Sequence, residues 1–228
     1  MSHKVKVNKI SDTEIEIEGE VETAKFSEYR KAALANLGKN AELPGFRKGH
    51  VPEDTLAERL GNGPVLEEMA ELALSATYPK IIEENKIDAI DRPHIQITKL
   101  AMDNPLTFKI RQTVLPEIKL PDYKKLAADV PRTTDVEDSQ TSDVQREKRW
   151  IGIAESLLAN VTVPVPPILV ERQVEQFLTH MKKEGPEARA AIRSEAEKYV
   201  RIQLILSSIA KKENLDIPGV VEMLENVK

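Results

Sequence analysis

Hydrophobic and polar residues alternate strictly near the start of the chain, which predicts β-strands. The segments "KVKVNKI" and "TEIEIEGEV" both have period two, and Ser11-Asp12 lies between them. We therefore expect a β-hairpin within residues 1–22. Two further alternating segments, "HIQITKL" and "LTFKIRQTVL", flank a turn sequence at Asp103. They predict a second hairpin.

The region between the hairpins has helical periodicity. One apolar stripe runs through residues 24–37, and Gly38 then reads as a stop signal. Proline is favoured in the first turn of a helix, so a short helix is expected near Pro52. A third helix is expected after the break at Gly61, with a kink or restart at Pro79. The first 115 residues thus predict an α+β domain of two hairpins with packed helices.

The remaining sequence predicts only helices. Three prolines within residues 116–133 indicate an extended linker. Residues 134–228 show no strand pattern, and four helices are expected there, which predicts an all-α domain. The second of these helices, starting at Pro167, carries a heptad-like apolar stripe.

Composition limits the cellular setting and the chemistry. The 228 residues suffice for one large or two modest domains, and none of them is cysteine. Disulfides and thiolate chemistry are thereby excluded, and a reducing compartment is expected. The start, "MSHKVKVNKI", lacks the apolar core of a signal peptide. No apolar run approaches the roughly 18 residues of a membrane span. We expect a cytoplasmic protein with no membrane partner.

The charge pattern indicates one anionic docking point. The net charge of −5 argues against a general DNA or RNA binder. Residues 29–52 are an exception, because they contain five basic residues and only Glu42 as an acid. A basic window on an acidic protein favours a local contact with an anionic partner. The five are Arg30, Lys31, Lys39, Arg47 and Lys48.

Motifs of catalysis are absent from the sequence. No P-loop, GxGxxG, HExxH or GxSxG occurs, and the four histidines are far apart in sequence. We predict no metal site, no cofactor and no enzymatic activity.

The stretch "LPGFRKGHVP" places an aromatic residue and two cations between glycines. In one interpretation the glycines supply positive φ angles and Phe46 packs inward as a hydrophobic staple. In the other, Phe46 and Arg47 are exposed as an interface hot spot in a narrow loop. The residues alone leave both interpretations open.

The same stretch resembles the GFRxGxxP signature of bacterial trigger factor, a ribosome-associated chaperone family. The neighbouring hairpin and helix, "YPKIIEEN" and "LPEIKL" resemble its ribosome-binding domain, and "VPVPPILVERQVEQFL" and "IAKKENLDIP" resemble its helical chaperone domain. The resemblance covers nearly the whole chain. The residues that match the fixed positions are Gly45, Phe46, Arg47, Gly49 and Pro52, and Lys48 fills the usual basic position.

The resemblance implies an ATP-independent molecular chaperone that docks at the ribosomal exit tunnel and shields nascent or unfolded chains. Phe46, Arg47 and Lys48 would contact a ribosomal protein and nearby rRNA of the large subunit. Client contacts would come from apolar residues of the helical half, although "YVRIQLILSSIA" also fits the central helix of a bundle. The client-binding candidates are Val170, Val174, Phe177, Met181, Ile202, Ile205 and Ile209.

The chain also departs from the usual plan of that family. Most members carry an FKBP-like prolyl isomerase domain between the two parts, and the linker predicted here leaves no room for one. Isomerase activity is therefore not expected, although a prolyl isomerase of the same family remains an alternative. A second alternative is a ribosome-associated or RNA-associated factor without chaperone activity. Its helical half would dimerise through the stripe of residues 167–181, so a homodimer stays open.

Overall fold

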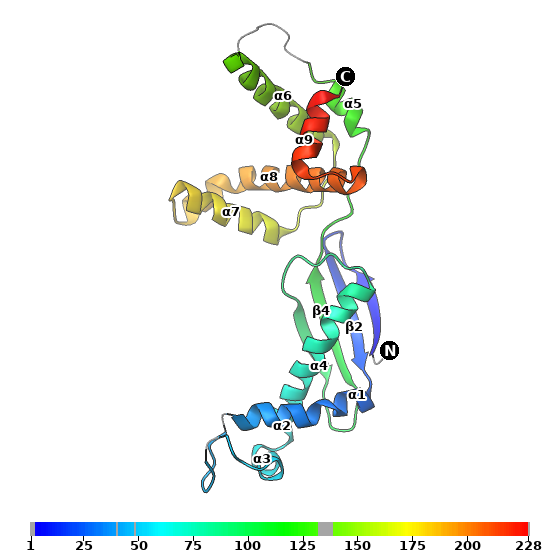
Figure 1. Ribbon diagram of the computed structural model, residues 1–228, viewed down its shortest axis with the longest axis vertical. Coiled ribbons are helices and arrows are strands. Elements are labelled where there is room, and N and C mark those ends of the chain that lie inside the picture. Colours follow the sequence, from blue (N-terminus) through cyan, green and yellow to red (C-terminus); the bar gives the residue numbers. More distant parts are fainter. Residues whose placement is uncertain (1–2, 40, 48, 132–138, 228) are drawn as a thin grey trace. The chain divides into compact units, whose positions relative to one another are not determined.

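The computed structural model describes residues 3–39, 41–47, 49–131 and 139–227. The chain divides into two compact units, residues 1–115 and residues 116–228, each with its own hydrophobic core (Figure 1). The first unit contains a sheet and helices, and the described part of the second is helical. The predicted fold class, an α+β part followed by an all-α part, is confirmed.

The sheet of the first unit joins the two predicted hairpins through their inner strands. Its strand order is β1-β2-β4-β3, and all neighbouring strands are antiparallel. Ile17 on β2 lies opposite Val7 on β1 and Ile110 on β4, so these side chains share one face of the sheet. The strands are β1 (His3–Lys9), β2 (Glu14–Val21), β3 (His94–Lys99) and β4 (Leu106–Thr113).

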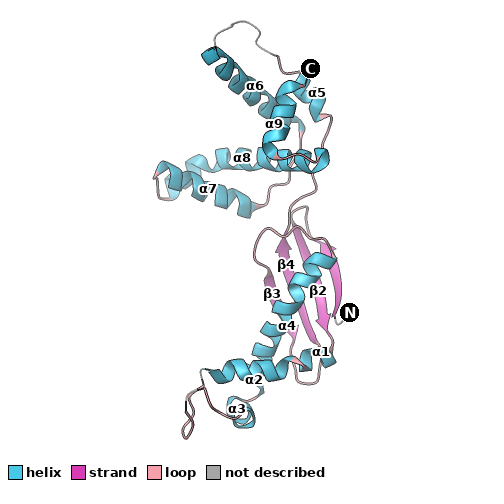
Figure 2. Cartoon of the chain, in the orientation of Figure 1, coloured by secondary structure: helices cyan, strands magenta, loops and turns pink. Residues whose placement is uncertain are grey.

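Helices cover the apolar face of this sheet. The long helix α4 runs across that face (Figures 1 and 2), and its Met69 and Ile81 are buried in the same core as Ile17, Phe108 and Ile110. The opposite face of β2 carries glutamates, of which Glu18 pairs with Lys109 of β4 at 2.6 Å. The helices of this unit are α1 (Thr23–Ser27), α2 (Tyr29–Lys39), α3 (Glu53–Leu60) and α4 (Asn62–Glu84).

Of the two expected glycine signals, one differs from the structure and one agrees with it. Gly38 does not end its helix, because α2 continues to Lys39. A Cβ on Gly38 would lie 3.4 Å from Leu56 Cδ2, an ordinary van der Waals contact with α3. Gly61, with φ 72°, ends α3 and separates it from α4, as expected. Pro79 lies inside α4 without ending it.

The extended linker expected over residues 116–133 is wrong for its described part. Residues 123–128 form α5, and Tyr123 and Ala127 of this helix are buried in the core of the second unit. The prolines suggested a linker, although prolines also occur at helix starts. The apolar residues between these prolines pack against the helices of the second unit. The other helices are α6 (Ser139–Asn160), α7 (Pro167–Met181), α8 (Pro186–Glu213) and α9 (Ile217–Asn226). Residues 132–138, where the linker and the next helix were expected to meet, lie outside the described residues.

The helices α7 and α8 form a hairpin whose inner face is apolar (Figure 1). Val170, Val174 and Leu178 of α7 are buried together with Ala196 of α8. Ion pairs border this seam: Arg189 lies 3.1 Å from Glu171, and further pairs join Arg189 to Glu175 and Arg193 to Glu171. Three residues of the heptad-like stripe of residues 167–181 are thus buried within the chain. Phe177 and Met181 of the same stripe stay accessible, so the homodimer stays a prediction.

Tyr123 anchors α5 to the end of α8. Its ring is buried, and its hydroxyl donates a hydrogen bond to Glu213 Oε1 at 2.5 Å. Lys124 Nζ lies 2.9 Å from the same oxygen, and Lys212 Nζ lies 5.0 Å from the centroid of the Tyr123 ring. Burial and the Glu213 carboxylate raise the pKa of Tyr123 to about 12. The hydrogen bond from Tyr123 lowers the pKa of Glu213.

Replacing Tyr123 with phenylalanine is expected to lower the unfolding free energy of the second unit by about 1 kcal/mol, since a hydrogen bond to a carboxylate is lost. Denaturant unfolding followed by the fluorescence of Trp150, which packs against the same core, measures this change. The control is Tyr199→Phe, because Tyr199 is exposed. An effect of equal size in the control would contradict the anchoring role of Tyr123.

Alkaline pH should remove the stabilisation that the hydrogen bond from Tyr123 to Glu213 provides. The folded-state pKa of Tyr123 lies above its ordinary value of 10, so the neutral phenol is favoured by folding. The contribution is therefore complete below pH 10 and is lost as the pH rises toward about 12. We expect wild type to lose more stability than Tyr123→Phe between these pH values. Parallel losses in both proteins would contradict the assignment.

Candidate functional site

The loop between α2 and α3 is closed at its base and folded into two turns. At the base, Gly49 N donates to Ala41 O at 3.2 Å. Farther out, Phe46 N donates to Leu43 O at 3.0 Å, and His50 N donates to Arg47 O at 2.9 Å. These backbone hydrogen bonds hold the described part of the loop in a narrow shape.

Two glycines make this shape attainable. Gly45 has φ 91° and Gly49 has φ 78°, a region that residues with a side chain rarely adopt. A Cβ on Gly49 would also lie only 3.1 Å from Lys39 O, where the loop returns to the end of α2. The backbone conformation therefore explains why both of these signature positions are glycine.

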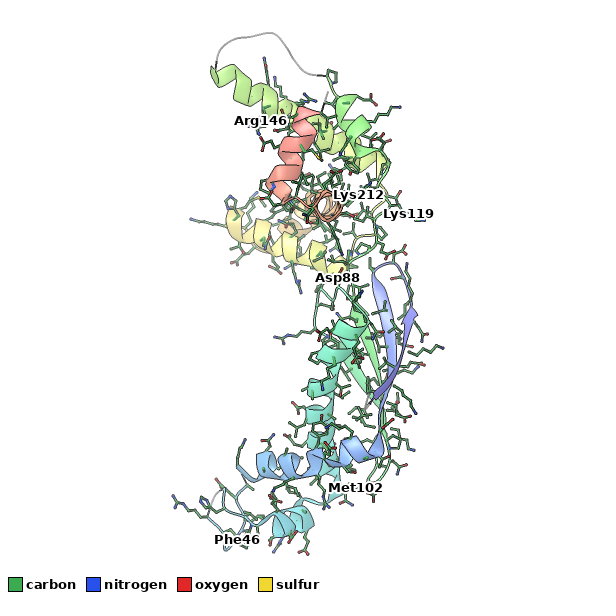
Figure 3. The ribbon with its side chains drawn as sticks, turned by 45° about the vertical axis from the view of Figure 1, so that its right-hand side comes forward. Phe46, Asp88, Met102, Lys119, Arg146 and Lys212 are labelled. Carbon is green, nitrogen blue, oxygen red and sulfur yellow. The ribbon has the colours of Figure 1, made fainter. Side chains whose placement is uncertain are left out.

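Phe46 lies at the exposed end of this loop. Its side chain is 41% exposed, and Figure 3 shows it beyond α2 and α3, away from the sheet. Leu43 and Val51, which flank the tip, are instead partly buried against the core. The interpretation of Phe46 as an inward staple is therefore wrong, since other apolar residues fix the loop and leave Phe46 accessible.

The charge beside Phe46 is uncompensated. Arg47 is exposed and forms no ion pair with any residue that the structure describes. Lys48, the third predicted contact residue, lies outside the described residues. Pro52 directly precedes α3, whose first turn holds Glu53 and Asp54. The loop thus presents an aromatic ring and a guanidinium group, which can contact an apolar side chain and an anionic group together.

The structure divides the predicted client-binding residues into two groups. Phe177 and Ile202 are half-buried and Met181 is 40% exposed, so these three are accessible. The other four are in the core and cannot touch a client in this conformation. They lie on the faces of α7 and α8 that pack against other helices. The buried four are Val170, Val174, Ile205 and Ile209.

Tyr199 was missing from the predicted set. It is 42% exposed, and its ring meets that of Phe177 edge to face, with centroids 5.7 Å apart. The aromatic pair joins α7 to α8 on a partly open surface. A signal was present in the sequence, since Tyr199 begins the apolar stretch "YVRIQLILSSIA".

Among the described residues, no group of three or more His, Asp or Glu side chains is placed to hold a metal ion. Within the same part of the chain, no helix has both the length and the hydropathy needed to span a bilayer. The loop and the partly open face of the helical unit remain the features to explain.

Comparison with known proteins agrees with the loop signature. The family model described as "Bacterial trigger factor protein (TF)" matches residues 3–148, and that of "Bacterial trigger factor protein (TF) C-terminus" matches residues 134–218. The first match alone covers more than half of the chain. Both halves that the sequence resemblance connected to this family are thus matched.

Individual relatives are much longer than this chain. The trigger factor of Corynebacterium diphtheriae is 30% identical over 149 residues, which cover 65% of this chain and 33% of the relative. Those of Clostridium kluyveri and Bacillus pumilus are 32% and 35% identical, over 63% and 56% of this chain and 32% and 29% of the relatives. The chain therefore spans about a third of the length of these relatives.

A solved structure from work on "Promiscuous Substrate Recognition in Folding and Assembly Activities of the Trigger Factor Chaperone" is also similar. Its TM-score is 0.44 at 19% identity, over 64% of this chain and 34% of that one. The two family-model matches, which together extend from residue 3 to residue 218, decide the assignment. The chain belongs to the bacterial trigger factor family.

Proposed function

We propose that the protein is an ATP-independent, ribosome-associated chaperone of the cytoplasm, and that the loop around Phe46 is its docking site. The observation that carries this proposal is the exposure of Phe46 in a loop closed by its own backbone, beside Arg47, which has no ion-pair partner among the described residues. Preorganisation lowers the entropy lost on binding. The partner is the large ribosomal subunit at the exit tunnel, where Phe46 meets a ribosomal protein and Arg47 and Lys48 meet rRNA phosphates.

The helical unit supplies the surface for nascent or unfolded chains. Its accessible apolar side chains are Phe177, Met181, Tyr199 and Ile202. Charged residues lie among them: Lys198 and Glu195, which pair at 3.8 Å, precede Tyr199 on α8. A mixed surface of this kind binds many sequences weakly and limits self-association.

Prolyl isomerase activity is not part of the proposal. Residues 116–138 connect the sheet unit to α6, and residues 123–128 of this connection form α5. A folded domain needs about 50 residues or more, so this connection is too short to contain one.

Two assays on the whole protein test the proposed function. Wild type should co-sediment with 70S ribosomes at low salt and less at moderate salt, because surface charge is screened. It should also suppress the aggregation of a chemically denatured client without added ATP. Absence of both activities would rule out the proposal, and a loss of only one would identify the failing half.

The client surface makes a separate prediction. Met181→Ser with Tyr199→Ser should raise the chaperone concentration needed for half suppression about fivefold, since about 1 kcal/mol of apolar contact is removed. The control is Leu215→Ser, which removes an apolar side chain of similar exposure from the turn before α9. Equal losses of aggregation suppression in the control and the double variant would contradict a specific client surface, because any exposed apolar side chain would then contribute to client binding.

A further inference from the structure

Helix α2, which leads into the loop, carries positive charge that no acid on the helix balances. Its sequence, "YRKAALANLGK", contains three basic residues and no aspartate or glutamate. Arg30 and Lys31 stand at its start and Lys39 at its end, and all three are exposed. The whole chain, by contrast, has a net charge of −5.

These three residues, here called the α2 cation stripe, have no carboxylate partner. Arg30 and Lys31 form no ion pair or side-chain hydrogen bond with the described part of the chain. Lys39 Nζ donates to Asn36 Oδ1 at 2.9 Å, and the Asn36 amide donates to Glu68 Oε1 at 2.9 Å, so Glu68 is linked to Lys39 only through a neutral amide. Lys109 and Arg111 on the polar face of the sheet differ from these residues, since they lie near Glu16 or Glu18.

The two lysines of the stripe are spaced to contact phosphates along one nucleic-acid strand. Lys31, Ala35 and Lys39 follow one another at intervals of four residues and are exposed, so they share one face of α2. Eight residues of helix span about 12 Å, which is roughly the axial length of three or four phosphates of one nucleic-acid strand. The small side chain of Ala35 between the lysines lets a strand approach the helix closely.

The stripe is continuous with the loop. Ala41 N donates to Gly38 O at 3.2 Å, and the loop returns to this point through the hydrogen bond from Gly49 N to Ala41 O. Lys39 therefore lies at the base of the loop that carries Phe46 and Arg47. These hydrogen bonds connect the end of α2 with the base of the loop that carries Arg47.

We propose that the α2 cation stripe binds the phosphate backbone of RNA next to the site where the loop docks. The inference rests on the proposed function, because ribosome binding brings α2 near RNA. A protein partner is less suited to this surface. Protein interfaces depend on aromatic and large apolar anchors, and the exposed face between the cations offers only alanine. Phosphate contacts need cations alone.

The test measures how salt changes the affinity for ribosomes. Labelled full-length protein is titrated with 50S subunits at several KCl concentrations, and the logarithm of the association constant is plotted against that of salt. Each lost phosphate contact reduces the slope by about 0.7 to 0.9. The variant Arg30→Gln with Lys31→Gln should therefore have a slope about 1.5 smaller than wild type. Its melting curve should match wild type.

The matched control replaces another exposed arginine and lysine that have no partner among the described residues, Lys80→Gln with Arg92→Gln. Its slope should equal that of wild type. A similar slope change in control and stripe variant, or none in either, would overturn the inference while docking through the loop stands. Loss of affinity with an unchanged slope would also overturn it and indicate a protein contact. Failure of wild type to bind would instead overturn the proposed function itself.

Discussion

Replacing Phe46 and Arg47 with alanine is expected to weaken ribosome binding at least 30-fold at low salt. Interface hot spots contribute about 2 kcal/mol or more when truncated, and 1.4 kcal/mol corresponds to tenfold in affinity. The expectation rests on the 41% exposure of Phe46 and on the exposed guanidinium group of Arg47, which pairs with no acid in the described part of the chain. The measurement is the fraction of protein that pellets with 70S ribosomes through a sucrose cushion over a range of ribosome concentrations.

The variant removes only exposed side chains, so its fold should be unchanged. The matched control is Leu115→Ala with Lys119→Ala, another exposed apolar and basic pair, in which Leu115 is 41% exposed. We expect this control to pellet like wild type. Equal binding by the loop variant and wild type would show that the loop is not the docking site.

A second large effect is expected at the centre of the sheet. Gly19 of β2 lies opposite Phe108 of β4, and a Cβ at this glycine would lie only 2.3 Å from Phe108 Cζ. The Phe108 ring is almost fully buried, so it cannot move aside without repacking the core. Gly19→Ala should therefore destabilise the first unit by about 3 kcal/mol and lower its Tm by roughly 10 °C.

Two optical signals separate this effect from the second unit. The unfolding transition of the sheet unit, followed by circular dichroism, should move to a lower temperature. The midpoint of the transition followed by the fluorescence of Trp150, which packs in the other core, should stay unchanged. The control is Gly63→Ala, because a Cβ there meets nothing within 4 Å. Combining Gly19→Ala with Phe108→Leu should recover part of the loss. Additive losses in that double variant would contradict a clash between these two residues.

The strands were predictable because the alternation in β1, β2, β3 and β4 is a local signal. Period two fixes which side chains share a face, and the register of Ile17 with Val7 and Ile110 follows it. The helix starts at Pro167 and Pro186 were predictable for a similar reason, since proline fits the first turn. The end of α2 was predictable only to within two residues, since helix ends have weak local signals and α2 continues past Gly38 to Lys39.

The candidate site could be named from the sequence, but the exposure of its residues could not be predicted. The residues of "LPGFRKGHVP" fit an inward or an outward Phe46 equally well, and the choice depends on Leu43 and Val51 filling the core instead. The same limit explains the four buried client candidates. Periodicity identifies the apolar face of α7 at Val170 and Val174, but only the fold shows that α8 covers it.

In the proposed function, the loop around Phe46 docks on the ribosome and the helical unit meets the emerging polypeptide. The most direct measurement is photocrosslinking on translating ribosomes, with benzoylphenylalanine in place of Phe46 in one protein and of Tyr199 in another. We expect the probe at position 46 to crosslink to a protein or RNA of the large subunit. The probe at position 199 should crosslink to the nascent chain. Crosslinks at position 46 that stay within the chain itself, or nascent-chain crosslinks equal at both positions, would contradict the account.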